Sequence, residues 1–335
     1  MTPSRATRKL ELVCPAGTPS GLRAAVEAGA HAVYCGFRDE TNARNFPGLN
    51  FDDSELRAGI GYAHDRGARV LVALNTFMRA GAPDLWKRRV DDAVRAGADA
   101  LILADLGLIA YARASHPNQR LHLSVQAAAA TPQAIAFYVE RFGIARVVLP
   151  RVLTIEEIAR LTAAAAPCET EVFVFGGMCV MAEGRCLLSS YATGKSPNMS
   201  GVCSPPSHVS YRDDNGALVT ALGGFTIERF APGEPAGYPT LCKGRFRANG
   251  SESHLFEEPV SLNAVGLLPQ LARTGVAALK IEGRQRGRAY VTAVVRAFRH
   301  ALDALARGDE PDTAALGALT EGQRNTTGAY RKAWR

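Results

Sequence analysis

Short apolar runs alternate with longer amphipathic stretches along most of the sequence, and this alternation constrains the fold more than any other feature. Runs that are rich in Val, Leu and Ile occur at residues 11–17, 31–37, 69–77, 98–105, 120–126, 145–151 and 171–177. Such runs are typical of parallel strands that are covered on both faces. The stretches between them have helical patterns, and several end in a glycine of the kind that caps a helix at its C-terminus.

The sequence supplies an eighth strand–helix unit late in the chain, as a closed barrel would require. Residues 276–282 have the pattern of a strand, with a helix predicted before it at 262–273 and another after it at 290–306. Eight units predict an α/β protein with a TIM-type (β/α)8 barrel. The alternative is a doubly wound open sheet, but residues 14–17 do not form the glycine-rich phosphate turn expected after its first strand.

A long segment rich in Gly, Pro, Ser and Asn separates the seventh predicted strand from the eighth. It contains a hairpin signal, in which the turn residues 213–216 lie between strand-like residues 209–211 and 217–221. Because it follows a strand, it is expected at the face where barrel enzymes keep their active sites. The predicted organisation is seven β/α units at 1–177, a cysteine-rich insertion at 178–259, a closing β/α unit at 260–307 and a C-terminal tail at 308–335.

The cysteines divide into two groups by their surroundings. Four of the seven lie in the insertion, among Gly, Pro, Ser and Arg residues: Cys179, Cys186, Cys203 and Cys242. The other three lie in apolar runs, where a cysteine behaves as a small hydrophobe: Cys14, Cys35 and Cys168. Structural zinc is typically held by closely spaced cysteine pairs, which the first group lacks. A 4Fe-4S cluster accepts ligands from separate loops, so the spacing favours a cluster over zinc, with unliganded cysteines as a third alternative.

Charge and hydropathy restrict the classes of function. The formal net charge of +7 allows an RNA-binding surface or a preference for anionic substrates. No run of five or more basic residues occurs, so we favour charges spread over solvated helices. No stretch reaches the 18 or more apolar residues that cross a bilayer, and residues 1–8 are polar and basic, without the features of a signal peptide. We therefore expect a cytoplasmic protein without a transmembrane segment.

A set of motifs gives the chain a resemblance to a known family. The motifs are Cys14-Pro-Ala-Gly17, Asn42-Ala-Arg44, Ser124-Val-Gln126, segments 173–186, 189–198 and 201–205, Gly237-Tyr-Pro-Thr-Leu-Cys-Lys-Gly244, Lys280-Ile-Glu-Gly-Arg-Gln-Arg286 and Thr326-Thr-Gly-Ala-Tyr330. On these residues the sequence resembles the collagenase-like, unclassified peptidase family over essentially its whole length. Within that family it is most similar to members that act in ubiquinone biosynthesis.

The resemblance implies a 4Fe-4S cluster on the four insertion cysteines. It also implies a heterodimer with a related UbiV-like protein and an accessory lipid-binding protein of the sterol-carrier type. Together these proteins would support anaerobic, oxygen-independent hydroxylation of the ring of a prenylated quinone precursor, with prephenate implicated as the oxygen donor. Sister families hydroxylate RNA bases, which makes an RNA-base hydroxylase the first alternative, although RNA is not the expected substrate here. A scaffold whose cluster only stabilises the fold is a further alternative.

Peptidase activity has little support from the residues themselves. A cysteine peptidase needs a free thiolate beside a histidine base, and only His208 and His254 lie near the insertion cysteines. The sequence contains neither G-x-S-x-G nor H-E-x-x-H. The family label therefore does not predict the chemistry.

A hydroxylase needs polar groups around its substrate, and the ends of the predicted strands supply them. The candidates for substrate binding are Arg44, Asn75, Asp105, Gln126, Arg151, Glu282 and Arg284. Arginines at this face would bind the carboxylate of an anionic donor or ring precursor through paired hydrogen bonds. The alternative is that Arg44, Arg151 and Glu282 form only a salt-bridge network at the barrel rim.

Overall fold

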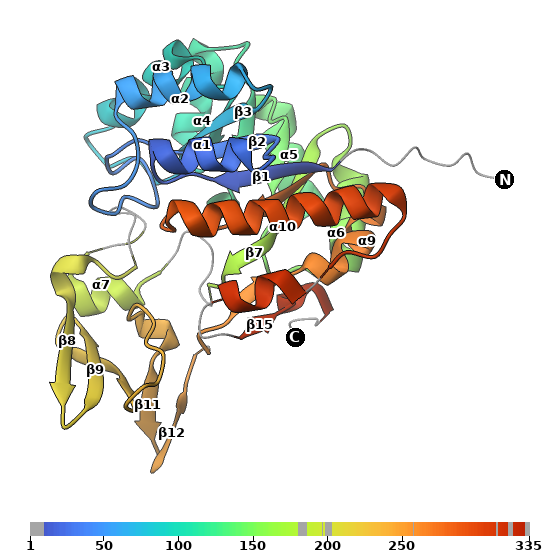
Figure 1. Ribbon diagram of the computed structural model, residues 1–335. Helices are drawn as coiled ribbons and strands as arrows, with labels where there is room; N and C mark the ends of the chain where they lie inside the picture. The colour runs from blue at the N-terminus through green and yellow to red at the C-terminus, as the bar shows by residue number, and fades with distance from the viewer. Residues whose placement is uncertain are drawn as a thin grey trace.

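The computed structural model describes residues 10–179, 186–195, 197, 203–256, 258–312, 314–320 and 324–331. Eight parallel strands close into a barrel in the order β14-β1-β2-β3-β4-β5-β6-β7, with β7 paired back to β14. The strands are β1 Glu11–Pro15, β2 Ala32–Cys35, β3 Arg69–Leu74, β4 Ala100–Leu103, β5 Leu121–Leu123, β6 Arg146–Val148, β7 Glu169–Gly177 and β14 Ala278–Ile281. The predicted TIM-type (β/α)8 fold is therefore confirmed, including its late eighth strand (Figure 1).

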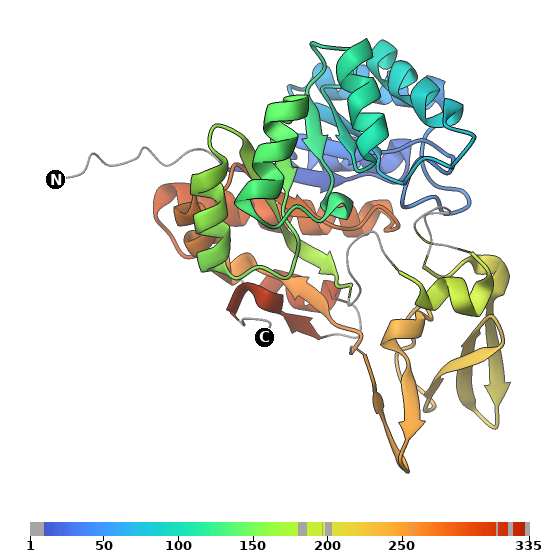
Figure 2. The same ribbon diagram turned by 180° about the vertical axis from the view of Figure 1, so that it is seen from behind.

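Helices surround this barrel (Figures 1 and 2). They are α1 Pro19–Glu27, α2 Asp53–His64, α3 Asp84–Ala96, α4 Leu106–Ser115, α5 Pro132–Phe142, α6 Ile155–Ala165, α9 Leu268–Thr274 and α10 Arg288–Arg307. Several begin where a polar side chain accepts a hydrogen bond from the first turn, as Asp52 and Thr154 do in complete capping boxes. Several end at a left-handed glycine, such as Gly97 with φ 93°.

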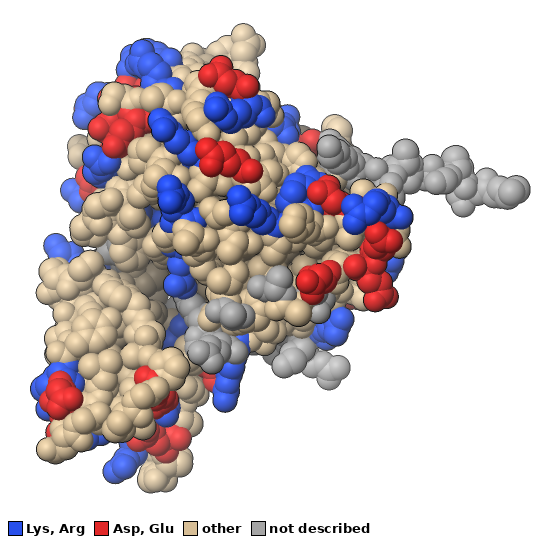
Figure 3. Space-filling view, in the orientation of Figure 1, with Lys and Arg blue, Asp and Glu red and all other residues tan. Residues whose placement is uncertain are grey.

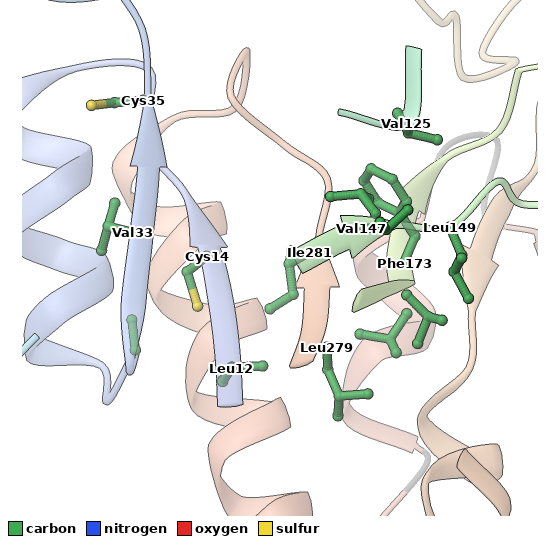
Figure 4. Packing of buried hydrophobic residues seen from close by; sticks show 14 of the residues in the cluster. Leu12, Cys14, Val33, Cys35, Val125, Val147, Leu149, Phe173, Leu279 and Ile281 are labelled. Carbon is green, nitrogen blue, oxygen red and sulfur yellow. The ribbon is translucent and has the colours of Figure 1, made fainter. Parts of the chain in front are cut away.

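The main apolar core lies between the barrel strands and the helices. Figure 4 shows part of it, with Leu12 and Cys14 of β1 beside Val33 and Cys35 of β2. Cys14, Cys35 and Cys168 are all buried in this core, as expected for cysteines that act as small hydrophobes. Burial raises the pKa of Cys35 to about 12, so this thiol stays protonated at neutral pH.

The inside of the barrel is part apolar and part ionic. Apolar side chains and one tyrosine fill its middle: Val13, Ala32, Tyr34, Leu71, Ala73, Ala100, Ile102 and Ala278. Arg146 lies among three glutamates there, with its guanidinium 2.6 Å from Glu11, 2.6 Å from Glu169 and 3.1 Å from Glu171. Lys280 makes a 2.7 Å ion pair with Glu171. The apolar appearance of the strands gave no indication of this network.

The insertion forms a lobe beside the barrel, with sheets of its own (Figures 1 and 2). One sheet has the order β10-β9-β8, from β8 Val209–Asp214, β9 Ala217–Leu222 and β10 Phe225–Phe230. The other pairs β11 Arg245–Ala248 with β12 Ser251–His254. The predicted hairpin is present as β8–β9, turning at Asn215 and Gly216, both with positive φ. The short helix α7 Leu188–Thr193 packs on this sheet at Gly223, where a Cβ would lie 1.8 Å from the Ala192 carbonyl oxygen.

One predicted helix is partly wrong. Residues 262–273 begin in a strand, β13 Ser261–Asn263, before the helical turn η4 Val265–Leu267 and helix α9. Tertiary pairing overrides the helical pattern here, because β13 runs antiparallel to the end of β7, with Ser261 opposite Gly177. The tail strand β15 Asn325–Thr326 then pairs with β13. Within the described part of the chain, no helix is both long and apolar enough to cross a membrane.

Candidate functional site

The predicted substrate-binding residues all lie where strands end at the C-terminal face of the barrel. Arg44 follows β2, Asn75 follows β3, Asp105 follows β4, Gln126 follows β5, Arg151 follows β6, and Glu282 and Arg284 follow β14. Parallel strands end at the same side of the sheet, so these side chains share one mouth. The contacts of these side chains differ, however, and they indicate which of them stabilise the surrounding loops.

Arg44 and Glu282 form an ion pair at the mouth, with Arg44 Nε 3.5 Å from Glu282 Oε1. The backbone N–H of Gly177, at the end of β7, donates to Glu282 Oε2 at 3.4 Å. Burial opposes ionisation of Glu282, but Arg44 and Arg151 outweigh it and hold the pKa of this carboxyl below its usual value. Glu282 is therefore ionised at neutral pH and belongs to the rim network that the sequence offered as an alternative.

Arg284 is a buried positive charge at the mouth. Its side chain is buried, with 5% of the residue exposed, and Nη1 donates to Asn42 Oδ1 at 2.6 Å. No carboxylate of a described residue lies within 4.0 Å of this guanidinium. Burial lowers the pKa of Arg284 to about 10, so it still carries a positive charge at neutral pH. A buried cation is costly unless it is paired, so this charge favours an anionic partner.

The other predicted residues have mixed roles. Both Asp105 oxygens accept backbone N–H groups, from Leu108 at 2.9 Å and Met78 at 3.2 Å, so its observed contacts are those of a helix cap. The amide oxygen of Asn75 accepts the N–H of Ala43 at 3.1 Å and so shapes the loop that carries Arg44. Gln126 has a buried side-chain oxygen, Oε1, with no hydrogen-bond partner among the described residues.

Sequence reasoning missed several residues that build the mouth. The Tyr34 ring lies 5.4 Å from the Arg284 guanidinium and 3.9 Å from the Lys280 ammonium. Phe173 stacks under Arg151 at 3.8 Å, and the Tyr330 hydroxyl donates to the Phe173 carbonyl. Tyr34 lies in an apolar strand, where the sequence does not distinguish it from a core residue. Asn42, Phe173 and Tyr330 carried a signal, because each stands in one of the family motifs.

The four insertion cysteines come from separate segments at this same end of the barrel. Cys179 follows β7 directly, Cys186 precedes α7, Cys203 lies before the turn η2 Pro206–His208, and Cys242 lies within η3 Leu241–Lys243. Cys179 is exposed and the other three are half-buried.

The thiols of these cysteines act on one another electrostatically. The pKa of Cys242 is raised to about 12, chiefly by burial, with the thiols of Cys179, Cys203 and Cys186 acting in the same direction and the charge of Lys243 opposing them. Burial likewise raises the pKa of Cys203, with the Arg44 guanidinium opposing it and the Cys186 thiol adding to it. Cys242 is therefore within electrostatic range of the other three thiols, and Arg44 is within range of Cys203 and Cys179. Among the described residues, no three His, Cys, Asp or Glu side chains are close enough together to bind a single metal ion.

Gly17 lets the backbone that carries Arg284 approach the first strand. A Cβ on Gly17 would lie 1.8 Å from the Arg284 carbonyl oxygen. We expect Gly17→Ala to lower the free energy of unfolding by about 1–3 kcal/mol, because the β14 loop must move. Equilibrium denaturation measures this, with Gly61→Ala as the control, since a Cβ there meets nothing within 4 Å. Equal stability of the two variants would contradict this account of Gly17.

The fold and the site together define a class of protein, a TIM-type barrel whose arginine-lined mouth faces a cysteine-bearing insertion. The chain belongs to peptidase family U32, whose family model matches residues 17–331.

Three curated relatives show the range of names in this family. The chain is 32% identical over 329 residues to tRNA hydroxylation protein P of Escherichia coli (strain K12), covering 93% of this chain and 72% of that protein. It is 29% identical to the 23S rRNA 5-hydroxycytidine C2501 synthase of the same organism, and the match covers 90% of this chain and 41% of that protein. It is 26% identical to a collagenase of Porphyromonas gingivalis, covering 93% and 69%. The chain thus has both RNA hydroxylation proteins and a collagenase among its homologues.

Proposed function

We propose that this protein is an iron–sulfur hydroxylation protein, with a 4Fe-4S cluster on Cys179, Cys186, Cys203 and Cys242 beside an anion-binding barrel mouth. The observation that carries the proposal is that four cysteines from separate segments lie at the C-terminal face of the barrel, where Cys242 is within electrostatic range of the other three. The names of the relatives support hydroxylation as the class of reaction.

The donor set suits a cluster better than a single ion. Four cysteine thiols are the usual ligands of 4Fe-4S clusters and of some structural zinc sites. A single zinc ion would need sulfurs about 2.3 Å from one centre, whereas each thiolate of a cluster binds a different iron and the sulfurs lie farther apart. The described thiols are neighbours without the close grouping that one ion requires. When bound, the cluster would supply one-electron transfer.

The mouth would bind the anionic co-substrate. Arg284 brings a buried positive charge that is paired with no carboxylate of a described residue, whereas Arg44 is paired with Glu282. This charge favours a carboxylate, which Arg284 would hold through hydrogen bonds from its guanidinium. We propose prephenate as the oxygen donor in this position. The unpartnered amide oxygen of Gln126 would accept a hydrogen bond from a hydroxyl group of the donor or the ring.

We propose the ring of a prenylated ubiquinone precursor as the substrate of this chain, in a UbiU-type complex with a UbiV-like partner and a sterol-carrier-like protein. The motifs around the cysteines and at 280–286 support this choice. The insertion lobe also exposes large apolar side chains that suit protein or lipid partners: Leu187, Tyr191, Tyr211, Phe225, Tyr238, Leu255 and Phe256.

Hydroxylation of an RNA base is the second candidate, and the names of the relatives support it more directly than they support the quinone ring. RNA binding would draw on basic side chains that neutralise phosphates. On the face shown in Figure 3, lysines and arginines are interspersed with aspartates and glutamates and do not form one continuous patch.

Peptidase activity fits the site poorly. No hydrogen bond joins a cysteine to a histidine anywhere in the described ranges, since His208 Nδ1 pairs with Ser207 Oγ and His254 Nδ1 with backbone carbonyl oxygens. The pKa of Cys203 and that of Cys242 are both raised, whereas a nucleophilic thiol requires a lowered one.

A deletion strain grown without oxygen separates the two substrates. We expect loss of the hydroxylated quinone with accumulation of its unhydroxylated precursor, while the hydroxylated nucleosides of tRNA and rRNA stay at the parental level. Mass spectrometry of quinones and of digested RNA measures both. Restoration by the wild-type gene but not by a Cys203→Ala gene ties the defect to the proposed centre. Normal quinone with one missing RNA modification would replace the quinone proposal by the RNA alternative.

A further inference from the structure

Arg44 is held in place from its backbone and from its side chain. Its N–H donates to Asn42 Oδ1 at 3.0 Å, and its carbonyl oxygen accepts from Asn50 Nδ2 at 2.8 Å. Nη1 donates to the Ala43 carbonyl oxygen at 2.8 Å, while Nε faces Glu282. A side chain fixed at this many points loses little further entropy when it acts on a neighbouring group.

Glu282 connects this arginine to the start of the cysteine-bearing segment. Its second carboxylate oxygen accepts from the N–H of Gly177, which stands two residues before Cys179. The backbones approach closely at this point, because a Cβ on Gly176 would lie 2.7 Å from Glu282 Cβ and the φ of Gly176 is 118°. The ion pair thus lies between the mouth, where Arg284 stands, and the segment that delivers Cys179.

We infer that Arg44, oriented by Glu282, is a positioning residue that links the barrel mouth to the four-cysteine centre and favours reduction of that centre. The inference rests on the proposed 4Fe-4S cluster. Such a cluster with four thiolates is an anion whose negative charge grows by one unit when it takes up an electron from a one-electron reductant. A fixed positive charge beside it stabilises the reduced form more than the oxidised form. The electrostatic effect of Cys203 and Cys179 on Arg44 supports the placement.

The test is a redox titration of the anaerobically purified full-length protein with dithionite, followed by electron paramagnetic resonance. We expect Arg44→Gln to retain iron and sulfide and to bind the electron about tenfold more weakly, which corresponds to a midpoint potential lower by ~59 mV. Arg44→Lys keeps the positive charge, so its midpoint potential should lie close to the wild-type value. Arg38→Gln is the matched control, because Arg38 comes from the same loop but pairs with Glu55 at 2.7 Å.

The outcomes separate this inference from the proposal on which it rests. Wild-type protein without iron and sulfide would overturn the cluster itself. A cluster whose potential is equal in wild type, Arg44→Gln and Arg38→Gln would overturn the role of Arg44 and leave the cluster standing. Should Arg44→Gln lose its cluster, the charge assignment predicts that Arg44→Lys keeps it, and loss in both variants would contradict that assignment.

Discussion

Replacing any one of Cys179, Cys186, Cys203 or Cys242 by Ser is expected to bring iron and acid-labile sulfide close to background and hydroxylated product to the level of a deletion strain. The cluster needs a thiolate at each iron, and each of the four thiolates comes from a different segment of the chain. Metal analysis of anaerobically purified variants, with quinone profiles of strains that carry them, measures both effects.

Cys168→Ser provides the control for this series. Cys168 is buried in the core at the start of β7, and its thiol contacts the Glu169 carbonyl oxygen at 3.6 Å. We expect this variant to keep wild-type iron content and activity, with only a modest loss of stability. A ligand variant that retains both iron and sulfide at the wild-type level would remove that cysteine from the site.

The largest effect on stability is expected from Glu171→Ala. Glu171 is fully buried inside the barrel, where it accepts from Lys280 Nζ at 2.7 Å and from Arg146 Nη1 at 3.1 Å. Removing one member of a buried ion network leaves charges without compensation and costs roughly 3–5 kcal/mol. Equilibrium unfolding in urea should show this loss, whereas the exposed Glu156→Ala should change stability by no more than about 0.5 kcal/mol.

Two further measurements identify the cause as electrostatic. The double variant Glu171→Leu, Lys280→Met removes the Lys280 cation together with the carboxylate. This variant should therefore lose less stability than Glu171→Ala alone. Burial opposes ionisation of Glu171, but Lys280 and Arg146 hold its pKa below the usual value. The stabilisation that ionised Glu171 provides is therefore fully present above the ordinary pKa of glutamate. It is lost as the pH falls through the lowered pKa of Glu171 in the folded protein. If the difference in the free energy of unfolding between wild type and Glu171→Ala stayed the same in acid, this explanation would be contradicted.

The barrel could be predicted because its strands repeat a local pattern. Alternation of apolar runs and helices, with glycine at helix ends, identified even the eighth strand beyond the insertion. Strand β13 could not be predicted in this way, because its conformation comes from pairing with residues 175–177, far away in sequence. The ionic interior was hidden for a related reason, since Arg146 and Lys280 become neighbours of Glu171 only when the barrel closes.

The candidate site was predictable in outline and not in its contacts. Strand ends collect at one face, which placed Arg44, Glu282 and Arg284 together. The sequence does not predict that Glu282 pairs with Arg44 rather than with Arg284, because this depends on loop geometry set by Asn42 and Asn50. Irregular cysteine spacing predicts a ligand set, whereas the electrostatic effects among the thiols depend on how the insertion folds back on the barrel.

Iron, zinc and acid-labile sulfide in the wild-type chain, purified without oxygen, together with its Mössbauer spectrum, test the central proposal most directly. The account predicts about four irons and four sulfides per chain, with the spectrum of a 4Fe-4S centre. Stoichiometric zinc without sulfide, or four free thiols without metal in a folded protein, would contradict it.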